Sequence, residues 1–196
     1  TDVLRRQAVV NAGITFRFRD QVGGKFETQE FLYENGIVDY VGELAGEILI
    51  GESSELYQKL YDENVIDADF SVDYERMKGM ALLELCGDSE QPERILQEVL
   101  QEAACVIKTG VDRALLDRLK KSVTGRRLRG LDGFEGTCYR MCAYYFDGAE
   151  YLEYPDIYAG VTAEDVEQFI RENVKEELAF VSVIRPKREK EEKSCC

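Results

Sequence analysis

The stretch GESSELYQKLYDENVIDADFSVDYE, residues 51–75, decides the fold class that we expect for this chain. Ser53 or Ser54 can cap a short helix that runs to about Asp62, because a hydroxyl at the cap satisfies one of the unpaired amides of the first turn. Residues 70–74 then alternate apolar and polar side chains, as a half-buried strand does. The helix has an apolar face formed, at three- and four-residue spacing, by Leu56, Tyr57 and Leu60. Tyr61 lies beside this face. A helix followed by a strand predicts an α+β domain.

Length and composition favour one globular domain. The chain has 196 residues, of which 44% are hydrophobic and 33% are charged, and a chain of this length can bury a sizeable core. No apolar run is as long as a membrane span, and no charged segment followed by an apolar one opens the chain, so we expect a cytoplasmic protein without a membrane partner. The opening residues TDVLRRQ lack an initiator methionine, which suggests a piece of a longer polypeptide.

Charge and residue types exclude several classes of function. A net charge of −14 repels phosphate groups, so we do not expect nucleic acid as a partner. The chain has no histidine, which removes histidine-based zinc sites and the nucleophile–histidine pairs of hydrolases. Cys138 and Cys142 lie one helical turn apart and would make half a metal site; the alternative, which we favour, is that they are small buried hydrophobic residues. We therefore expect no cofactor and no metal.

The segment GITFRFRDQVGGKFETQEFLY, residues 13–33, predicts a β-hairpin. Ile14, Phe16 and Phe18 alternate with polar side chains in its first arm, and the glycine pair at 23–24 permits the chain to reverse. The second arm alternates at Phe26, Thr28, Glu30 and Leu32. We expect a short helix at 3–10 before the hairpin and another helix from about Asn35, with one apolar face made by Ile37, Tyr40, Val41 and Leu44.

The remaining sequence predicts further strands and helices. The apolar run at 79–86 is typical of a central strand that pairs with residues 70–74. Pro92 suits the first turn of a helix that continues to Gly110, and Asp112 opens the next helix. The later elements are expected to be an aromatic-rich helix at 133–148, a helix introduced by a near-capping box at 162–165, and a last strand at 178–184.

Two of these helices have unusual compositions. In the helix that begins at Asp112 we expect a solvated basic face balanced by acidic neighbours, with a site for an anionic partner as the alternative. Its basic side chains are Arg118, Lys120, Lys121, Arg126, Arg127 and Arg129, opposite an inward face of Leu115, Leu116, Leu119 and Val123. In the helix at 133–148 we expect the aromatic side chains to pack into the core: Phe134, Tyr139, Tyr144, Tyr145 and Phe146.

Four separated blocks resemble, in order and spacing, the C-terminal half of insulinase/pitrilysin-type zinc peptidases, above all bacterial members that are similar to the mitochondrial processing peptidase. The blocks are EILIGESSELYQKLYDENVID, GDSEQPERILQEVLQE, TGVDRALLDRLKKSVTGRRLRGL and TAEDVEQFI…ELAFVSVIRP, and together they cover roughly residues 47–186. The resemblance implies an α+β half domain in which helices pack on one face of an antiparallel sheet. An ordinary α+β domain would give the same helix–strand pattern without this kinship.

The opening residues resemble a different family. The order LRRQAVVNAGITFRFRD…FLYENGIVDYVGEL, within residues 1–46, is similar to the end of the ATPase domain of DNA gyrase B, but it holds none of that family's nucleotide-binding elements. The resemblances imply a composite: a hairpin and helix at 1–46, a peptidase-like domain at 47–186 and a disordered charged tail at 187–196. In such a composite the hairpin would occupy the sheet position of the peptidase-like domain's missing first strand.

The peptidase resemblance implies a non-catalytic role. The family carries its zinc ligands on a His-x-x-Glu-His helix of its N-terminal half, which a chain without histidine cannot contain. The C-terminal half of the family offers an arginine and a tyrosine to the substrate backbone, and by position these fall near Tyr61 and Phe70, where neither polar group is present. We therefore expect no activity from the chain alone.

The expected role is a wall of a peptide chamber, or a partner module, in a zinc peptidase assembly. The expected partners are a peptide and either a catalytic peptidase half or a second copy of the chain. A remnant of a gyrase-type ATPase, and a fusion fragment without a function of its own, are the alternatives.

Overall fold

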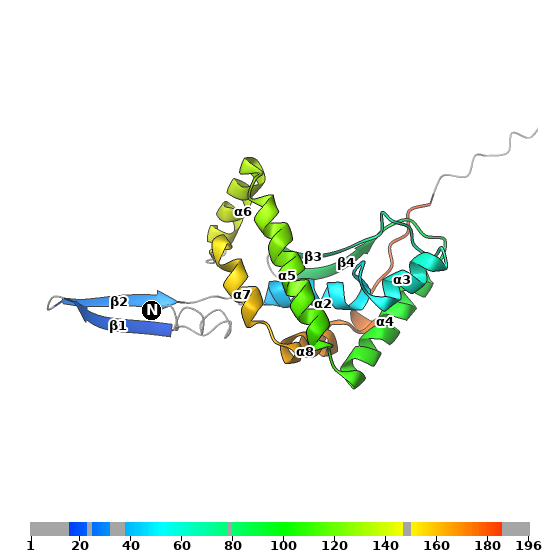
Figure 1. Cartoon of the computed structure of the whole chain (residues 1–196), viewed down its shortest axis with the longest axis horizontal. Helices are drawn as coiled ribbons and strands as arrows, with labels where there is room; N and C mark the ends of the chain where they lie inside the picture. The colour runs from blue at the N-terminus through cyan, green and yellow to red at the C-terminus, as the bar shows by residue number, and fades with distance from the viewer. Residues whose placement is uncertain (1–15, 23–24, 32–37, 78–79, 147–149, 186–196) are drawn as a thin grey trace, which may run out of the picture.

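The computed structural model describes residues 16–22, 25–31, 38–77, 80–146 and 150–185. Antiparallel strands combine with a larger set of helices, which confirms the expected α+β class (Figure 1). The strands are β1 (Phe16–Val22), β2 (Lys25–Phe31), β3 (Ser71–Met77) and β4 (Met80–Cys86). The helices are α2 (Val38–Ile50), α3 (Glu55–Asp62), α4 (Pro92–Thr109), α5 (Arg113–Gly130), α6 (Phe134–Phe146), α7 (Tyr154–Gly160) and α8 (Ala163–Asn173), with short 3-10 turns η1 (Tyr151–Glu153) and η2 (Glu176–Leu178).

The predicted N-terminal hairpin is confirmed, but it stands apart. β1 and β2 pair antiparallel from Phe16 opposite Phe31 to Val22 opposite Lys25. They form a two-stranded sheet separate from β3–β4, and Figure 1 shows them to one side of the helices. The prediction that this hairpin fills a position in the peptidase-like sheet is therefore wrong. Pairing between neighbouring strands closes a short loop, whereas joining a distant strand costs more chain entropy.

Three predictions lie outside the described residues. These are the helix at 3–10, the glycine reversal at 23–24 and the character of the tail at 187–196.

Helix α2 lies at the centre of the larger core. Leu44, Ala45 and Leu49 on this helix are fully buried, and α2 contacts β3, β4, α4, α5 and α8. Two glycines one turn apart let it approach the β3–β4 hairpin closely. A Cβ atom added at Gly42 would lie 2.5 Å from the ring of Tyr74, and one added at Gly46 would lie 2.8 Å from Leu83. The predicted apolar face of this helix is confirmed by the burial of Tyr40, Val41 and Leu44.

A second core lies where α3 and α4 meet the start of β3. The predicted cap of α3 is confirmed: the backbone N–H of Tyr57 donates to the Ser54 hydroxyl at 3.1 Å. Lys59 of α3 also pairs with Glu98 of α4 at 2.7 Å. Pro92 stands in the first turn of α4, as predicted. The buried members of this core are Ile50, Leu56, Tyr57, Leu60, Val65, Ile66, Phe70, Ile95 and Val99.

The local start signals of α5 and α8 are also confirmed. The backbone N–H of Ala114 donates to the Asp112 carboxylate at 2.8 Å, which caps α5. Thr162 and Asp165 form a reciprocal capping box at the start of α8. The inward faces agree with the prediction as well, because these side chains are buried: Leu116, Leu119, Val123, Val166, Phe169 and Ile170.

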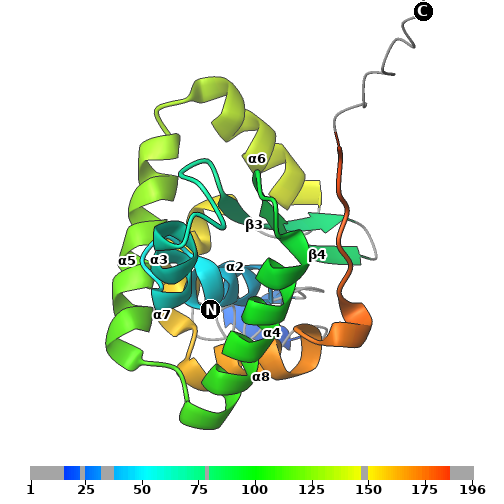
Figure 2. The ribbon, with the colours of Figure 1, turned by 90° about the vertical axis from the view of Figure 1, so that its right-hand side faces the viewer.

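The predicted last strand is wrong. Residues 179–185 have no strand assignment, and η2 occupies the start of the segment. Leu178, Phe180 and Ile184 are 61%, 76% and 97% exposed. Figure 2 shows this segment leaving α8 as a single extended chain. An alternating sequence becomes a strand only where a neighbour supplies backbone partners, and among the described strands β3 and β4 bond only to each other.

The predicted burial of α6 is also wrong. Its described residues include none that is fully buried. Phe134, Tyr139, Tyr145 and Phe146 are each at least 75% exposed, and only Tyr144 of the predicted aromatic set packs partly against the core. Cys138 and Cys142 are exposed free thiols rather than buried hydrophobic residues. The reason is that η1 is the principal neighbour of α6, so a single face of the helix is covered.

None of the helices in the described part of the chain is long and apolar enough to cross a membrane.

Candidate functional site

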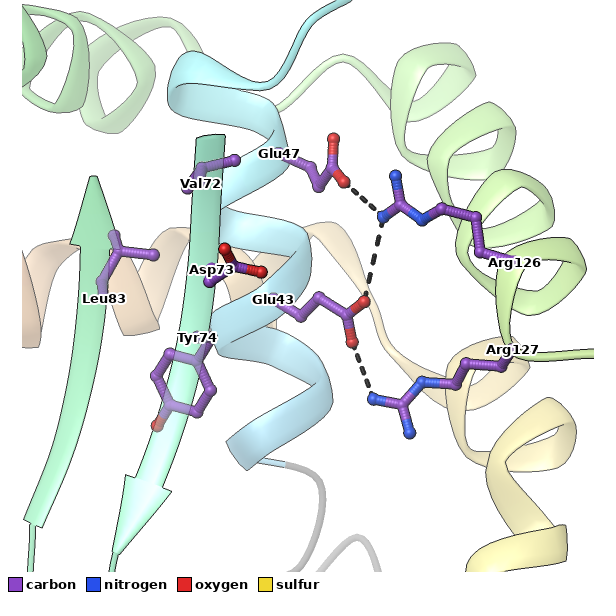
Figure 3. Close-up of a pocket in the computed structure, with 8 residues that line it drawn as sticks. All are labelled: Glu43, Glu47, Val72, Asp73, Tyr74, Leu83, Arg126 and Arg127. Carbon is purple, nitrogen blue, oxygen red and sulfur yellow. Dashed lines mark hydrogen bonds and ion pairs between the residues drawn. The ribbon is translucent and has the colours of Figure 1, made fainter. Parts of the chain in front are cut away.

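A pocket of about 410 Å³ opens between α2, the β3–β4 hairpin and α5. Figure 3 shows glutamates from α2 facing arginines from α5, with the hairpin forming the opposite wall. The lining residues are Glu43, Glu47, Val72, Asp73, Tyr74, Leu83, Arg126 and Arg127. The pocket therefore has a charged side made by two helices and a mixed side made by the strands.

The charged side is an ion-pair network between α2 and α5. Arg127 pairs with Glu43 at 2.9 Å, and Arg126 pairs with Glu47 and lies 3.9 Å from Glu43 (Figure 3). Glu43 and Glu47 are four residues apart and so project from the same side of α2. The adjacent arginines of α5 reach them from across the pocket, which ties the two helices together.

A group of tyrosines surrounds Arg127. Its guanidinium lies 5.2 Å from the ring centre of Tyr40 and 5.4 Å from that of Tyr158, within the range of cation–π attraction. Arg127 also donates to the Tyr144 hydroxyl at 3.1 Å, and the Tyr158 hydroxyl donates to Glu43. Glu43 of α2 thus accepts hydrogen bonds from side chains of two other helices, α5 and α7.

Burial sets the protonation of this group. It disfavours the phenolate and raises the pKa of Tyr158 and of Tyr40 well above the ordinary tyrosine value, and the Glu43 carboxylate adds to the rise at Tyr158. Burial opposes the charge of Arg127, but the surrounding tyrosines and Glu43 outweigh it and raise the pKa of Arg127. Tyr158 and Tyr40 therefore stay neutral, and Arg127 stays charged.

This chemistry suits binding better than proton transfer. Glu43 and Glu47 both accept hydrogen bonds from guanidinium groups, so their carboxylate oxygens are already engaged and they are weak candidates for a general base. No cluster of three metal-ligating side chains exists within the described residues. A ligand in the pocket would meet hydrogen-bonding and charged groups, including the exposed Asp73 on β3.

The two predicted substrate-contact residues lie in another place. Tyr57 of α3 links them: its ring centre is 6.3 Å from that of Tyr61 and 6.3 Å from that of Phe70. Tyr61 is 44% exposed, whereas Phe70 is 6% exposed and packs against Gly87 in the second core. Neither residue lines the pocket. The surface position of Tyr61 leaves its ring available for contact, and the role of both residues remains a prediction.

Sequence reasoning missed the pocket. Its charged residues are far apart in the chain, since Glu43 and Arg127 are 84 positions apart. A signal was present: α2 is otherwise apolar on most sides, and two glutamates one turn apart on such a helix predict paired partners. The balance expected between the basic face of α5 and acidic neighbours is found at Arg126 and Arg127.

Comparison with known proteins gives this fold a family context. Residues 34–123 match the family described as the Peptidase M16 inactive domain. This match supports kinship with the insulinase-type, or M16, peptidases. The M16 match begins at residue 34, ahead of Val38, and so includes the whole of α2, the hairpin β3–β4 and the first part of α5.

Individual M16-like proteins agree with the family match. A curated relative from Bacillus subtilis, described as the uncharacterized zinc protease YmfH, is 24% identical over 143 residues, which is 72% of this chain and 33% of the relative. A crystal structure of an M16-like peptidase from Alicyclobacillus acidocaldarius shares the fold with a TM-score of 0.64 at 22% identity, covering 69% of this chain and 33% of that one. A protease from Helicobacter pylori gives 0.57 at 15% identity, with 69% and 34% covered.

These comparisons also limit what can be transferred. The chain spans about a third of the length of the relatives named above. The resemblance of residues 1–46 to DNA gyrase B is not shown by these comparisons, and it stays a prediction from the sequence.

Proposed function

We propose that this chain is a non-catalytic M16-like domain that forms one wall of a peptide-binding chamber in a zinc peptidase assembly. The observation that carries the proposal is the match of residues 34–123 to the M16 inactive domain in a chain with no histidine. Zinc peptidases of this kind need imidazole ligands, so the metal and the activated water would belong to a separate catalytic half.

The charge of the chain favours a cationic peptide. The net charge of −14 attracts positive ligands over long range and repels acidic ones. Asp73 stands in the pocket wall opposite the paired arginines, and Tyr61 offers an exposed ring on α3. A peptide in the pocket would find the carboxylate of Asp73 and several hydrogen-bonding groups.

Two measurements on the purified chain test the proposal. The first is turnover of fluorogenic peptides with added zinc and with a chelator; we expect none in either condition. The second is fluorescence anisotropy with a labelled unstructured cationic peptide and with an acidic peptide of equal length. We expect binding of the cationic peptide that weakens as salt is added, because screening reduces the attraction between exposed charges. Chelator-sensitive turnover, or equal affinity for both peptides, would contradict the proposal.

Matched variants separate specific contact from the general negative field. Asp73→Asn removes one charge from the pocket, and Glu93→Gln removes one charge from the exposed side of α4. If the peptide contacts the pocket, Asp73→Asn weakens binding by several-fold and Glu93→Gln leaves it within experimental error. Equal effects of the two variants would show that attraction is diffuse and that the pocket is not the contact site.

A further inference from the structure

The outward side of α6 is an apolar surface on an otherwise acidic chain. Phe134, Tyr139, Tyr145 and Phe146 are 82%, 75%, 76% and 84% exposed, and Met141 is 44% exposed. We call this the α6 outer face, consisting of Phe134, Glu135, Cys138, Tyr139, Met141, Cys142, Tyr145 and Phe146. Exposed aromatic residues gathered in this way mark interaction surfaces, whereas isolated ones are ordinary.

The opposite side of α6 contacts the rest of the domain. Arg140 donates to the Tyr151 hydroxyl at 3.2 Å, and the ring of Tyr144 meets that of Tyr151 edge to face at 5.2 Å. The Thr137 hydroxyl donates to the carbonyl of Gly130 at 3.3 Å. At 3.6 residues per turn these inner residues and the outer face lie on opposite sides of the helix. Figure 1 shows α6 at the far end of α5, at the edge of the molecule, where another protein can reach it.

We propose that the α6 outer face binds a second copy of this chain, with the two α6 helices antiparallel. A two-fold interface requires one surface to complement itself. When the two-fold axis crosses the two helices at the level of Arg140, Phe134 lies beside the partner's Tyr145, and Cys138 lies beside the partner's Cys142. Tyr139 and Met141, one residue either side of that level, lie near their own copies. Glu135 and the partner's Phe146 also lie beside each other, and every other position on this face is matched with an apolar, aromatic or thiol side chain.

Size and charge also suit a second copy. Four aromatic residues of roughly 200 Å² each, about four-fifths exposed, offer about 600 Å² per copy, close to the ~800 Å² per partner of a stable interface. Glu135 is the one charged residue of the outer face, so two chains of net charge −14 can approach here with little local repulsion. The small Cys138 and Cys142 lie in the middle of the face, where they let the two backbones come close.

The first experiment measures the oligomeric state by light scattering across a range of concentrations. The expected result for the wild type is a dimer that dissociates on dilution. Phe134→Glu and Tyr145→Glu each weaken the dimer at least about tenfold, because they place a charge against an aromatic side chain of the other copy. Leu178→Glu, at an exposed leucine outside this face, leaves the dimer unchanged. Circular dichroism confirms that each variant is folded.

The second experiment tests the antiparallel register by oxidation with copper–phenanthroline. Its background is a variant with serine at the four other cysteines, Cys86, Cys105, Cys195 and Cys196. This background forms a disulfide-linked dimer, because each bond joins Cys138 of one copy to Cys142 of the other. Cys138→Ser and Cys142→Ser each lose most of the cross-link when oxidised alone, and an equal mixture of the two recovers it.

Specific results overturn the proposal. A wild-type monomer at all concentrations, or a dimer that survives both glutamate variants, shows that the outer face does not bind a second copy. Cross-linking by either single-serine variant as efficiently as by the background rules out the antiparallel register. The α6 outer face shares no residue with the pocket, so failure here leaves the proposed peptide contact standing, and failure of the peptide contact leaves the dimer standing.

Discussion

Replacing Arg127 with methionine should destabilise the whole helical core, because Arg127 connects four helices. It extends from α5, pairs with Glu43 of α2 at 2.9 Å, donates to Tyr144 of α6 at 3.1 Å and lies over the ring of Tyr158 of α7. Methionine retains much of the volume and the apolar stem but removes the charge. Glu43 would then keep the Tyr158 hydroxyl and the more distant Arg126 as its partners.

The structure sets the size of this effect. Removing one partner of a fully buried ion pair costs about 3–5 kcal/mol, and the side chains of Arg127 and Glu43 are still 21% and 26% exposed. Solvent therefore screens part of the pair, and we reduce its share to about 2 kcal/mol. The lost cation–π contacts add about 1 kcal/mol. The expected loss of about 3 kcal/mol is a large part of the ~5–15 kcal/mol by which a domain is stable.

The assay is urea unfolding followed by circular dichroism, with Arg129→Met as the matched control on the same helix. Arg129 is exposed, so its variant should stay within about 0.5 kcal/mol of the wild type. A double-mutant cycle with Glu43→Gln should give a coupling energy between about 0.5 and 3 kcal/mol. The reasoning fails if Arg127→Met costs no more than Arg129→Met, or if the two single losses simply add in the double variant.

Three further predictions concern single residues. Burial raises the pKa of Tyr158, so the folded state holds the phenol proton more tightly than the unfolded state, and the stability present below about pH 10 is lost as the pH rises further. Urea titrations at alkaline pH should show the free energy of unfolding falling with pH, and Tyr158→Phe should make this fall less steep. The same pH dependence in the wild type and in Tyr158→Phe would contradict this. Gly51→Ala places a Cβ 2.6 Å from the backbone oxygen of Glu47 and should cost about 1–3 kcal/mol. At this chain length the melting temperature should fall by about 2–4 °C for each kcal/mol, so an unaltered thermal transition would count against the geometry. Tyr61→Arg should leave the free energy of unfolding within about 0.5 kcal/mol of the wild type, because Tyr61 is partly exposed. Phe70→Ala should lower it by about 3–5 kcal/mol in the same denaturation assay, because Phe70 is buried. Similar losses in the two variants would contradict the difference in burial between the two residues.

Features decided by neighbouring residues were predictable from the sequence. The Ser54 cap, the Pro92 helix start and the Thr162 capping box each depend on residues within a few positions, and all three are present. The hairpin arms on either side of residues 23–24 follow from alternation alone, and the register from Phe16 to Val22 confirms them. In each case the sequence carries the signal because the interaction itself is local.

Features decided by distant partners were not predictable in this way. Residues 178–184 alternate as a strand does, but a strand also needs a neighbour to bond to, and the described sheet gives them none. The aromatic residues of α6 have the composition of a core helix, yet their burial depends on what packs against them. The network of Glu43 and Arg127 required knowing that α2 and α5 lie side by side, which neither helix reveals alone.

Helix α2, rather than the helix–strand unit at 51–75, is the element on which both fold and pocket depend. One side carries Gly42 and Gly46, which admit Tyr74 and Leu83 of the hairpin at close range. Another side carries the glutamates that hold the arginines of α5. A two-stranded hairpin is marginal alone in water, so β3–β4 owes its stability to this contact. The two glycines therefore let the hairpin lie close to α2. This close approach sets the distance between the hairpin and α5, and so the width of the pocket between them.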